Sequence, residues 1–210
     1  MEYENAKKGL RKVYNAQILL IIAAIISIVS VVVMAILGKA IQSGAEDINN
    51  TDVISVLFII AAGIISIIAF FLNFIGVGRT SRDDESFKHA LIMLVIGLAS
   101  SVISSALQNR LPNLARYLDY LHDISSLFVS YYVIGGCMSI AGKKNEEGLV
   151  STCKTARTFI IIAWIITIVL EFLSGAVNGF VGVLAIVAAI CEIVSYIIYL
   201  VILSKTLRIL

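Results

Sequence analysis

A polar stripe within the most C-terminal apolar stretch contains the residues best suited to chemistry. Glu192 stands near the middle of the apolar run 180–203, about 17 Å from either end at the helical rise per residue. Ser195, Tyr196 and Tyr199 follow at i+3, i+4 and i+7, so all four share one helical face. An acid at that depth costs about 2.5–3.5 kcal/mol and is usually functional or paired. Either the stripe lines a hydrated path, or Glu192 is a protonated carboxyl bonded to a neighbouring helix.

Polar or small residues recur at matching depths in two other apolar runs. The runs can be aligned on the basic residues that follow them, which are Arg79, Lys143 and Lys205. This alignment puts Ser66 and Ser130 opposite Glu192, and Asn73 and Cys137 opposite Tyr199. The sequence therefore predicts that the second, fourth and sixth runs face a common axis.

Other ionisable residues give weaker indications of chemistry. Glu171 falls near the outer end of the fifth run, where it either snorkels to the interface or contacts a cation. The two histidines, His89 and His122, are predicted on opposite sides of a membrane and cannot share a metal. No metalloprotease, hydrolase or phosphate-loop motif occurs. We therefore expect no enzyme, no metal and no cofactor.

The composition requires that these residues be positioned by membrane helices. Hydrophobic residues make up 60% of the 210 residues and charged residues 14%, whereas soluble domains have about 25% charged residues. One transmembrane helix needs about 20 apolar residues. This excludes a soluble domain, a disordered chain or a separate catalytic domain. We predict an all-α protein with six transmembrane helices, at about 17–37, 53–77, 90–107, 123–141, 158–173 and 180–203.

The distribution of basic residues predicts the orientation. Of 16 Lys and Arg residues, only Lys39, Arg110 and Arg116 lie in the connections after the first, third and fifth runs. The positive-inside rule therefore puts both termini in the cytoplasm. We expect a multipass protein of the cell membrane, on the assumption of a prokaryotic host.

The alternation also resembles three copies of a two-helix unit, over 5–79, 82–143 and 144–210. The segments 82–87 and 144–149 both read basic, polar, acid, acid, small, apolar. The alternative is that all inner connections simply combine basic and acidic residues, with Asp83-Asp84-Glu85 as a solvated face near basic partners.

Two further patterns predict how the helices pack. Gly97, Ser101 and Ser105 form a row of small residues at four-residue spacing, which favours close helix approach. Leucines recur on one helical face before the fourth run, at positions 111, 114, 118 and 121. They predict either a short helix lying at the outer interface or packing onto the ends of the bundle.

The functional expectation is a small permease or channel, for an ion or small solute, lined by the even-numbered helices. The alternative is a non-catalytic interaction, assembly or regulatory protein of the membrane. The expected partners are the lipid bilayer, a small solute or ion, and a membrane protein or a second copy of the chain. The net charge of +2 gives no indication of nucleic acid.

Overall fold

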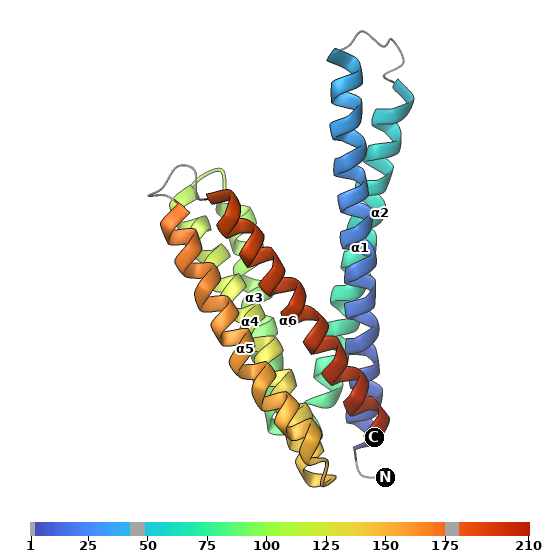
Figure 1. Ribbon diagram of the computed structural model, residues 1–210, viewed down its shortest axis with the longest axis vertical. Coiled ribbons are helices and arrows are strands. Elements are labelled where there is room, and N and C mark those ends of the chain that lie inside the picture. The colour runs from blue at the N-terminus through green and yellow to red at the C-terminus, as the bar shows by residue number, and fades with distance from the viewer. Residues whose placement is uncertain (1–2, 43–48, 175–180) are drawn as a thin grey trace. The chain divides into compact units, whose positions relative to one another are not determined.

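The computed structural model describes residues 3–42, 49–174 and 181–210, and all six of their regular elements are helices. Side chains at 34–42, 49–55, 167–174, 181–189 and 192 lie outside the description. The helices are α1 (Glu4–Gln42), α2 (Asn49–Thr80), α3 (Glu85–Leu107), α4 (Pro112–Lys143), α5 (Glu147–Ser174) and α6 (Val181–Ile209) (Figure 1). The predicted all-α class is confirmed.

Five of these helices are long and apolar enough to cross a membrane. The qualifying stretches lie in α1 to α5, and they contain between 20 and 32 residues each. Large apolar side chains are exposed along them, as expected where the surrounding medium is lipid. The sixth span, in the 29-residue α6, stays a prediction because part of that helix has no described side chains.

The chain divides into two compact units. One contains Met1–Leu10 and Val77–Leu210, and the other contains Arg11–Gly76. The predicted hairpins 82–143 and 144–210 therefore fall within the same unit. The threefold repeat stays a prediction.

Helix α4 is the centre of the larger unit, since it contacts α3, α5 and α6. Its contact with α3 is close because small residues meet there. A Cβ at Gly97 would lie 3.2 Å from the Ser125 Cβ. The His122 Nδ1 lies 2.9 Å from the Gly97 carbonyl oxygen, and the Ser104 hydroxyl donates to the Ala115 carbonyl at 3.1 Å. These hydrogen bonds join α3 and α4.

The predicted row of small residues on α3 is wrong beyond Gly97. The buried face of α3 consists of Phe87, Ala90, Leu94, Gly97, Ser100 and Ser104. Ser101 is only half-buried, and the exposed Ser105 donates to the carbonyl of its own helix at Ser101. A strict four-residue row rotates by about 40° per step on a 3.6-residue helix, so it leaves the contact face.

The leucine pattern before the fourth run belongs to neither predicted arrangement. Helix α4 is continuous from Pro112, which stands at its first position. Proline is tolerated there because an amide at that position has no acceptor within the helix. Leu114, Leu121 and Tyr117 are exposed, Tyr117 by 70%. This face therefore does not pack onto the bundle, and no separate interfacial helix forms, because the helical hydrogen bonding continues into the fourth run.

Candidate functional site

The C-terminal part of the predicted stripe on α6 faces the interior. Tyr199 is only 5% exposed, and Tyr196 and Ser195 are half-buried. Ile193 and Ile197 are exposed, so the polar residues and the apolar ones occupy different faces. The Ser195 hydroxyl donates to the Cys191 carbonyl of its own helix at 2.8 Å. The side chains of Glu192 and Glu171, the two acids predicted within the apolar runs, lie outside the described residues.

Helix α6 contacts α4, and both helices bury residues of the predicted alignment. Cys137 of α4 is fully buried, and Tyr199 of α6 is 5% exposed. Thr206 is itself buried and donates to the Ile202 carbonyl at 2.9 Å. Tyr199 and Cys137, which the alignment of the runs put at one depth, are therefore both enclosed within the larger unit.

The remaining predicted site residues are half-buried and are not all in one unit. Ser130 lies on α4, in the same unit as Cys137, seven residues before it. Ser66 and Asn73 lie on α2 in the second unit. The Asn73 Oδ1 is buried and has no hydrogen-bond partner in the described part of the chain, a state that usually costs about 1–3 kcal/mol. The common axis of α2, α4 and α6 stays a prediction.

Sequence reasoning missed a polar junction around Asp84. Its side chain is only 9% exposed. One carboxylate oxygen accepts from the Ser86 amide at 2.9 Å and so caps α3. The other accepts from the Ser139 hydroxyl of α4 at 2.6 Å and lies 3.9 Å from the Lys143 Nζ. Lys143 is thus a basic partner of the kind predicted for the acidic cluster Asp83-Asp84-Glu85. The cluster is not a uniformly solvated face, however, because only Glu85 is exposed. An Asp immediately before an apolar run is the signal that indicates this cap.

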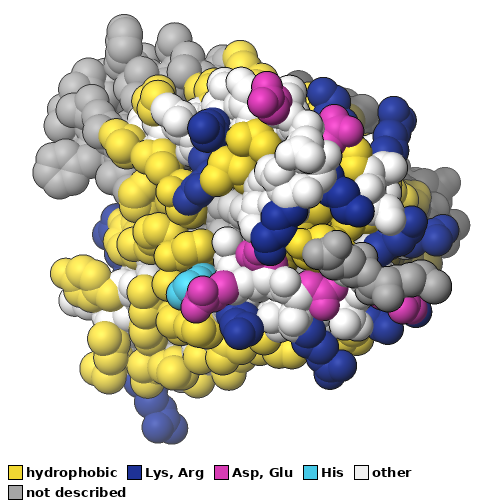
Figure 2. Space-filling model, turned by 90° about the horizontal axis from the view of Figure 1, so that it is seen from below, with side chains coloured by type: hydrophobic (Ala, Val, Ile, Leu, Met, Phe, Trp, Pro, Cys, Tyr) yellow, Lys and Arg dark blue, Asp and Glu magenta, His cyan; other side chains and the backbone are white. Residues whose placement is uncertain are grey.

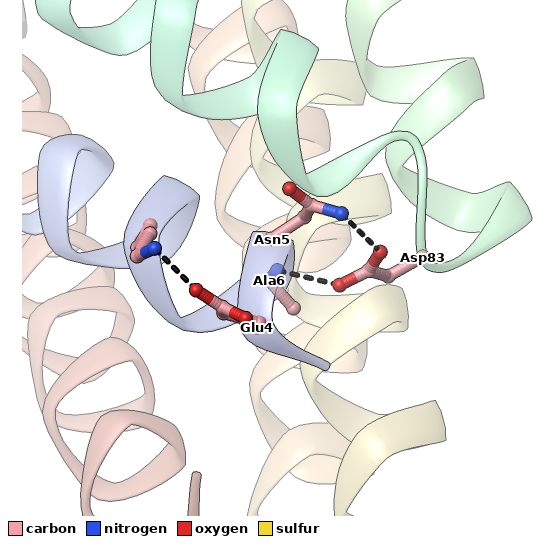
Figure 3. Close-up of polar contacts among 5 residues, drawn as sticks. Glu4, Asn5, Ala6 and Asp83 are labelled. Carbon is pink, nitrogen blue, oxygen red and sulfur yellow. Dashed lines mark hydrogen bonds and ion pairs between the residues drawn. The ribbon is translucent and has the colours of Figure 1, made fainter. Parts of the chain in front are cut away.

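The neighbouring Asp83 caps the start of α1 from a distance of 77 residues (Figure 3). Its carboxylate accepts from the Ala6 amide at 2.7 Å and from the Asn5 side-chain amide at 3.1 Å. The first amides of a helix have no partner within it. Asp83 therefore supplies the hydrogen-bond acceptor that these amides lack within α1.

Replacing Asp83 with alanine is expected to speed amide hydrogen exchange in the first turns of α1. The Ala6 amide loses its acceptor, and removing a cap costs about 0.5–2 kcal/mol. Exchange followed by mass spectrometry on a peptide covering residues 3–10 measures the effect. Glu4→Gln, at an exposed position of the same turn, is the control. Equal exchange in the two variants would contradict the assigned cap.

Arg157 forms the second junction that the sequence did not reveal. Its guanidinium carbon lies 3.7 Å from the centre of the Tyr131 ring, within cation–π range. The Arg157 Nε is buried and has no hydrogen-bond partner among the described residues. Figure 2 shows Lys and Arg side chains, with acidic side chains among them, on the face of the molecule seen from below.

Comparisons with known proteins give no relative. No protein-family model, curated protein or solved structure matches the chain. Within residues 3–42, 49–174 and 181–210, no group of three His, Cys, Asp or Glu residues is placed to hold a metal ion. The class that the fold defines is an all-helical protein with several candidate membrane-spanning helices.

Proposed function

We propose that this protein is a small permease or channel that moves an ion or small solute across the cell membrane. The observation that carries the proposal is the inward-facing polar surface of α6. Tyr199 is buried on α6, which contacts α4, and position 192 falls on the same helical face, two turns earlier. An acid on an inward face of a membrane helix is typical of ion and proton pathways.

The proposed orientation has both termini in the cytoplasm. Within the larger unit, the start of α1 and the end of α6 lie at the same end as the α2–α3 and α4–α5 connections (Figure 1). Together with the first 12 residues and the last six, those connections and their flanks hold 13 of the 16 Lys and Arg residues, including Arg82, Lys143 and Lys144. The positive-inside rule supports this arrangement for a multipass protein.

The experiment that tests the function is flux through liposomes containing the purified protein. We expect vesicles with the wild-type chain to conduct protons or small cations faster than empty vesicles. Glu192→Gln removes the charge and keeps the shape, so we expect at least about a tenfold slower flux, which corresponds to about 1.4 kcal/mol. A pH-sensitive dye inside the vesicles and a panel of cations and metabolites outside provide the measurement.

The matched control is Glu85→Gln. Glu85 is an exposed acid at the first position of α3, so the substitution removes the same charge outside the proposed path. Flux should then equal that of the wild type. If wild-type vesicles are as tight as empty ones across the panel, the transport proposal is wrong and the assembly alternative takes its place. Co-purification of a stoichiometric partner in mild detergent would then identify it.

A further inference from the structure

Arg157 stands out in the larger unit because no described carboxylate forms an ion pair with its guanidinium. The Tyr131 ring beside it supplies a π face but no hydrogen-bond acceptor, and the buried Nε has no hydrogen-bond partner among the described residues. In the same unit, the carboxylate of Asp84 is already engaged by Ser86, Ser139 and Lys143. A guanidinium that lies over a ring and pairs with no described carboxylate is suited to binding an external anion.

The guanidinium and the Ser86 side chain both approach Gly135 of α4. A Cβ built on Gly135 would lie 3.7 Å from the Ser86 hydroxyl oxygen and 3.9 Å from the Arg157 guanidinium carbon. The Ser86 hydroxyl of α3 and the Arg157 guanidinium of α5 therefore both lie close to the backbone of α4 at this glycine. An oxygen atom held between them would have donors from two different helices.

We propose that Arg157, Tyr131 and Ser86 form a binding site for a phosphate group. Arg157 supplies the fork of donors that matches phosphate oxygens, the Tyr131 ring packs against that fork, and the Ser86 hydroxyl supplies a donor from α3. Arg157 immediately precedes the predicted apolar run 158–173, and Ser86 lies four residues before the run 90–107. This is the depth of lipid headgroups, so the phosphate belongs either to an anionic lipid or to a soluble phosphate.

The site does not depend on the proposed transport activity, because none of its three residues belongs to the predicted path. Its binding can therefore be measured on the purified full-length chain in detergent. Native mass spectrometry counts retained phosphatidylglycerol, with phosphatidylcholine as the comparison lipid. A separate titration adds inorganic phosphate and measures displacement of the lipid. This titration distinguishes a soluble phosphate ligand from a lipid headgroup.

We expect the wild type to retain phosphatidylglycerol over phosphatidylcholine, and Arg157→Gln to weaken that binding about tenfold. Arg157→Lys keeps the charge but loses the planar fork, so its affinity for phosphatidylglycerol should lie between that of the wild type and that of Arg157→Gln. Gly135→Ala makes only ordinary contacts and should fold normally, yet its methyl group comes close to both Ser86 and Arg157 and should weaken binding too. Lys154→Gln removes an exposed charge from the same helix and should change the affinity less than about twofold.

The outcomes separate the sources of the phosphate and can overturn the site. If millimolar inorganic phosphate displaces phosphatidylglycerol from the wild type, and this displacement is lost in Arg157→Gln, the ligand is a soluble phosphate. Retention of the lipid against inorganic phosphate, with the same dependence on Arg157, identifies the headgroup. Equal losses in Arg157→Gln and Lys154→Gln, or undiminished binding in Gly135→Ala, would show diffuse attraction to the basic face and overturn the proposal.

Discussion

Replacing Gly136 with alanine is expected to lower the stability of the helix bundle by about 1–3 kcal/mol, the usual effect of overpacking a core. The added Cβ would lie 2.4 Å from two carbons of the Phe87 ring and 2.8 Å from a third. Phe87 has no exposed surface, so the ring cannot turn out of the way without displacing its neighbours. The ring of α3 packs directly on the backbone of α4 at this glycine.

Gly142→Ala is the matched control for this effect. Gly142 lies on the same helix, and a Cβ there would meet nothing within 4 Å. Alanine is the better helix former by about 1 kcal/mol, so this variant should be neutral or slightly more stable. Thermal unfolding of both proteins in one detergent gives the comparison. Phe87→Leu combined with Gly136→Ala should recover part of the loss, because the smaller side chain vacates the clash. Identical melting of the two glycine variants would show that Phe87 does not pack there.

The sequence predicts the helices well because apolar runs and basic connections are strong local signals. All six runs correspond to helices, with 180 just before the start of α6. The starts of α1 and α4 are predicted 13 and 11 residues too late, at 17 and 123 instead of Glu4 and Pro112. Hydropathy measures only the apolar part of a helix, whereas backbone hydrogen bonding continues through charged residues such as Lys8 and Arg116.

The polar junctions could not be predicted because they join residues far apart in the sequence. Asp84 and Ser139 are separated by 55 positions, and no local pattern pairs Arg157 with Tyr131. Only the N-terminal cap of α3 has a local signature. The burial of individual side chains could not be predicted either. Ser195 and Tyr199 share a predicted helical face, but only the packing of α6 against α4 shows that Tyr199 is enclosed.

Replacing Asp84 with alanine is expected to destabilise the larger unit by about 2–3 kcal/mol. Loss of the α3 cap contributes about 1 kcal/mol, and loss of the charge-assisted bond from Ser139 contributes about 1.5–3 kcal/mol before the structure relaxes. The Lys143 contact, at 3.9 Å and with the lysine half-exposed, adds little. The effect should therefore come from the two hydrogen bonds rather than from the ion pair.

Asp84→Asn separates these contributions, because asparagine is also a good N-cap and its carbonyl oxygen still accepts a hydrogen bond. It should retain more than half of the stability lost in Asp84→Ala. A double-mutant cycle with Ser139→Ala, read by thermal unfolding in detergent, measures the coupling between α3 and α4 directly. We expect a coupling of about 1 kcal/mol or more, whereas Glu85→Ala, an exposed neighbour on the same turn, should show none with Ser139. If the cycle at Asp84 is additive, the carboxylate serves only to cap α3, and α4 is held by its apolar contacts alone.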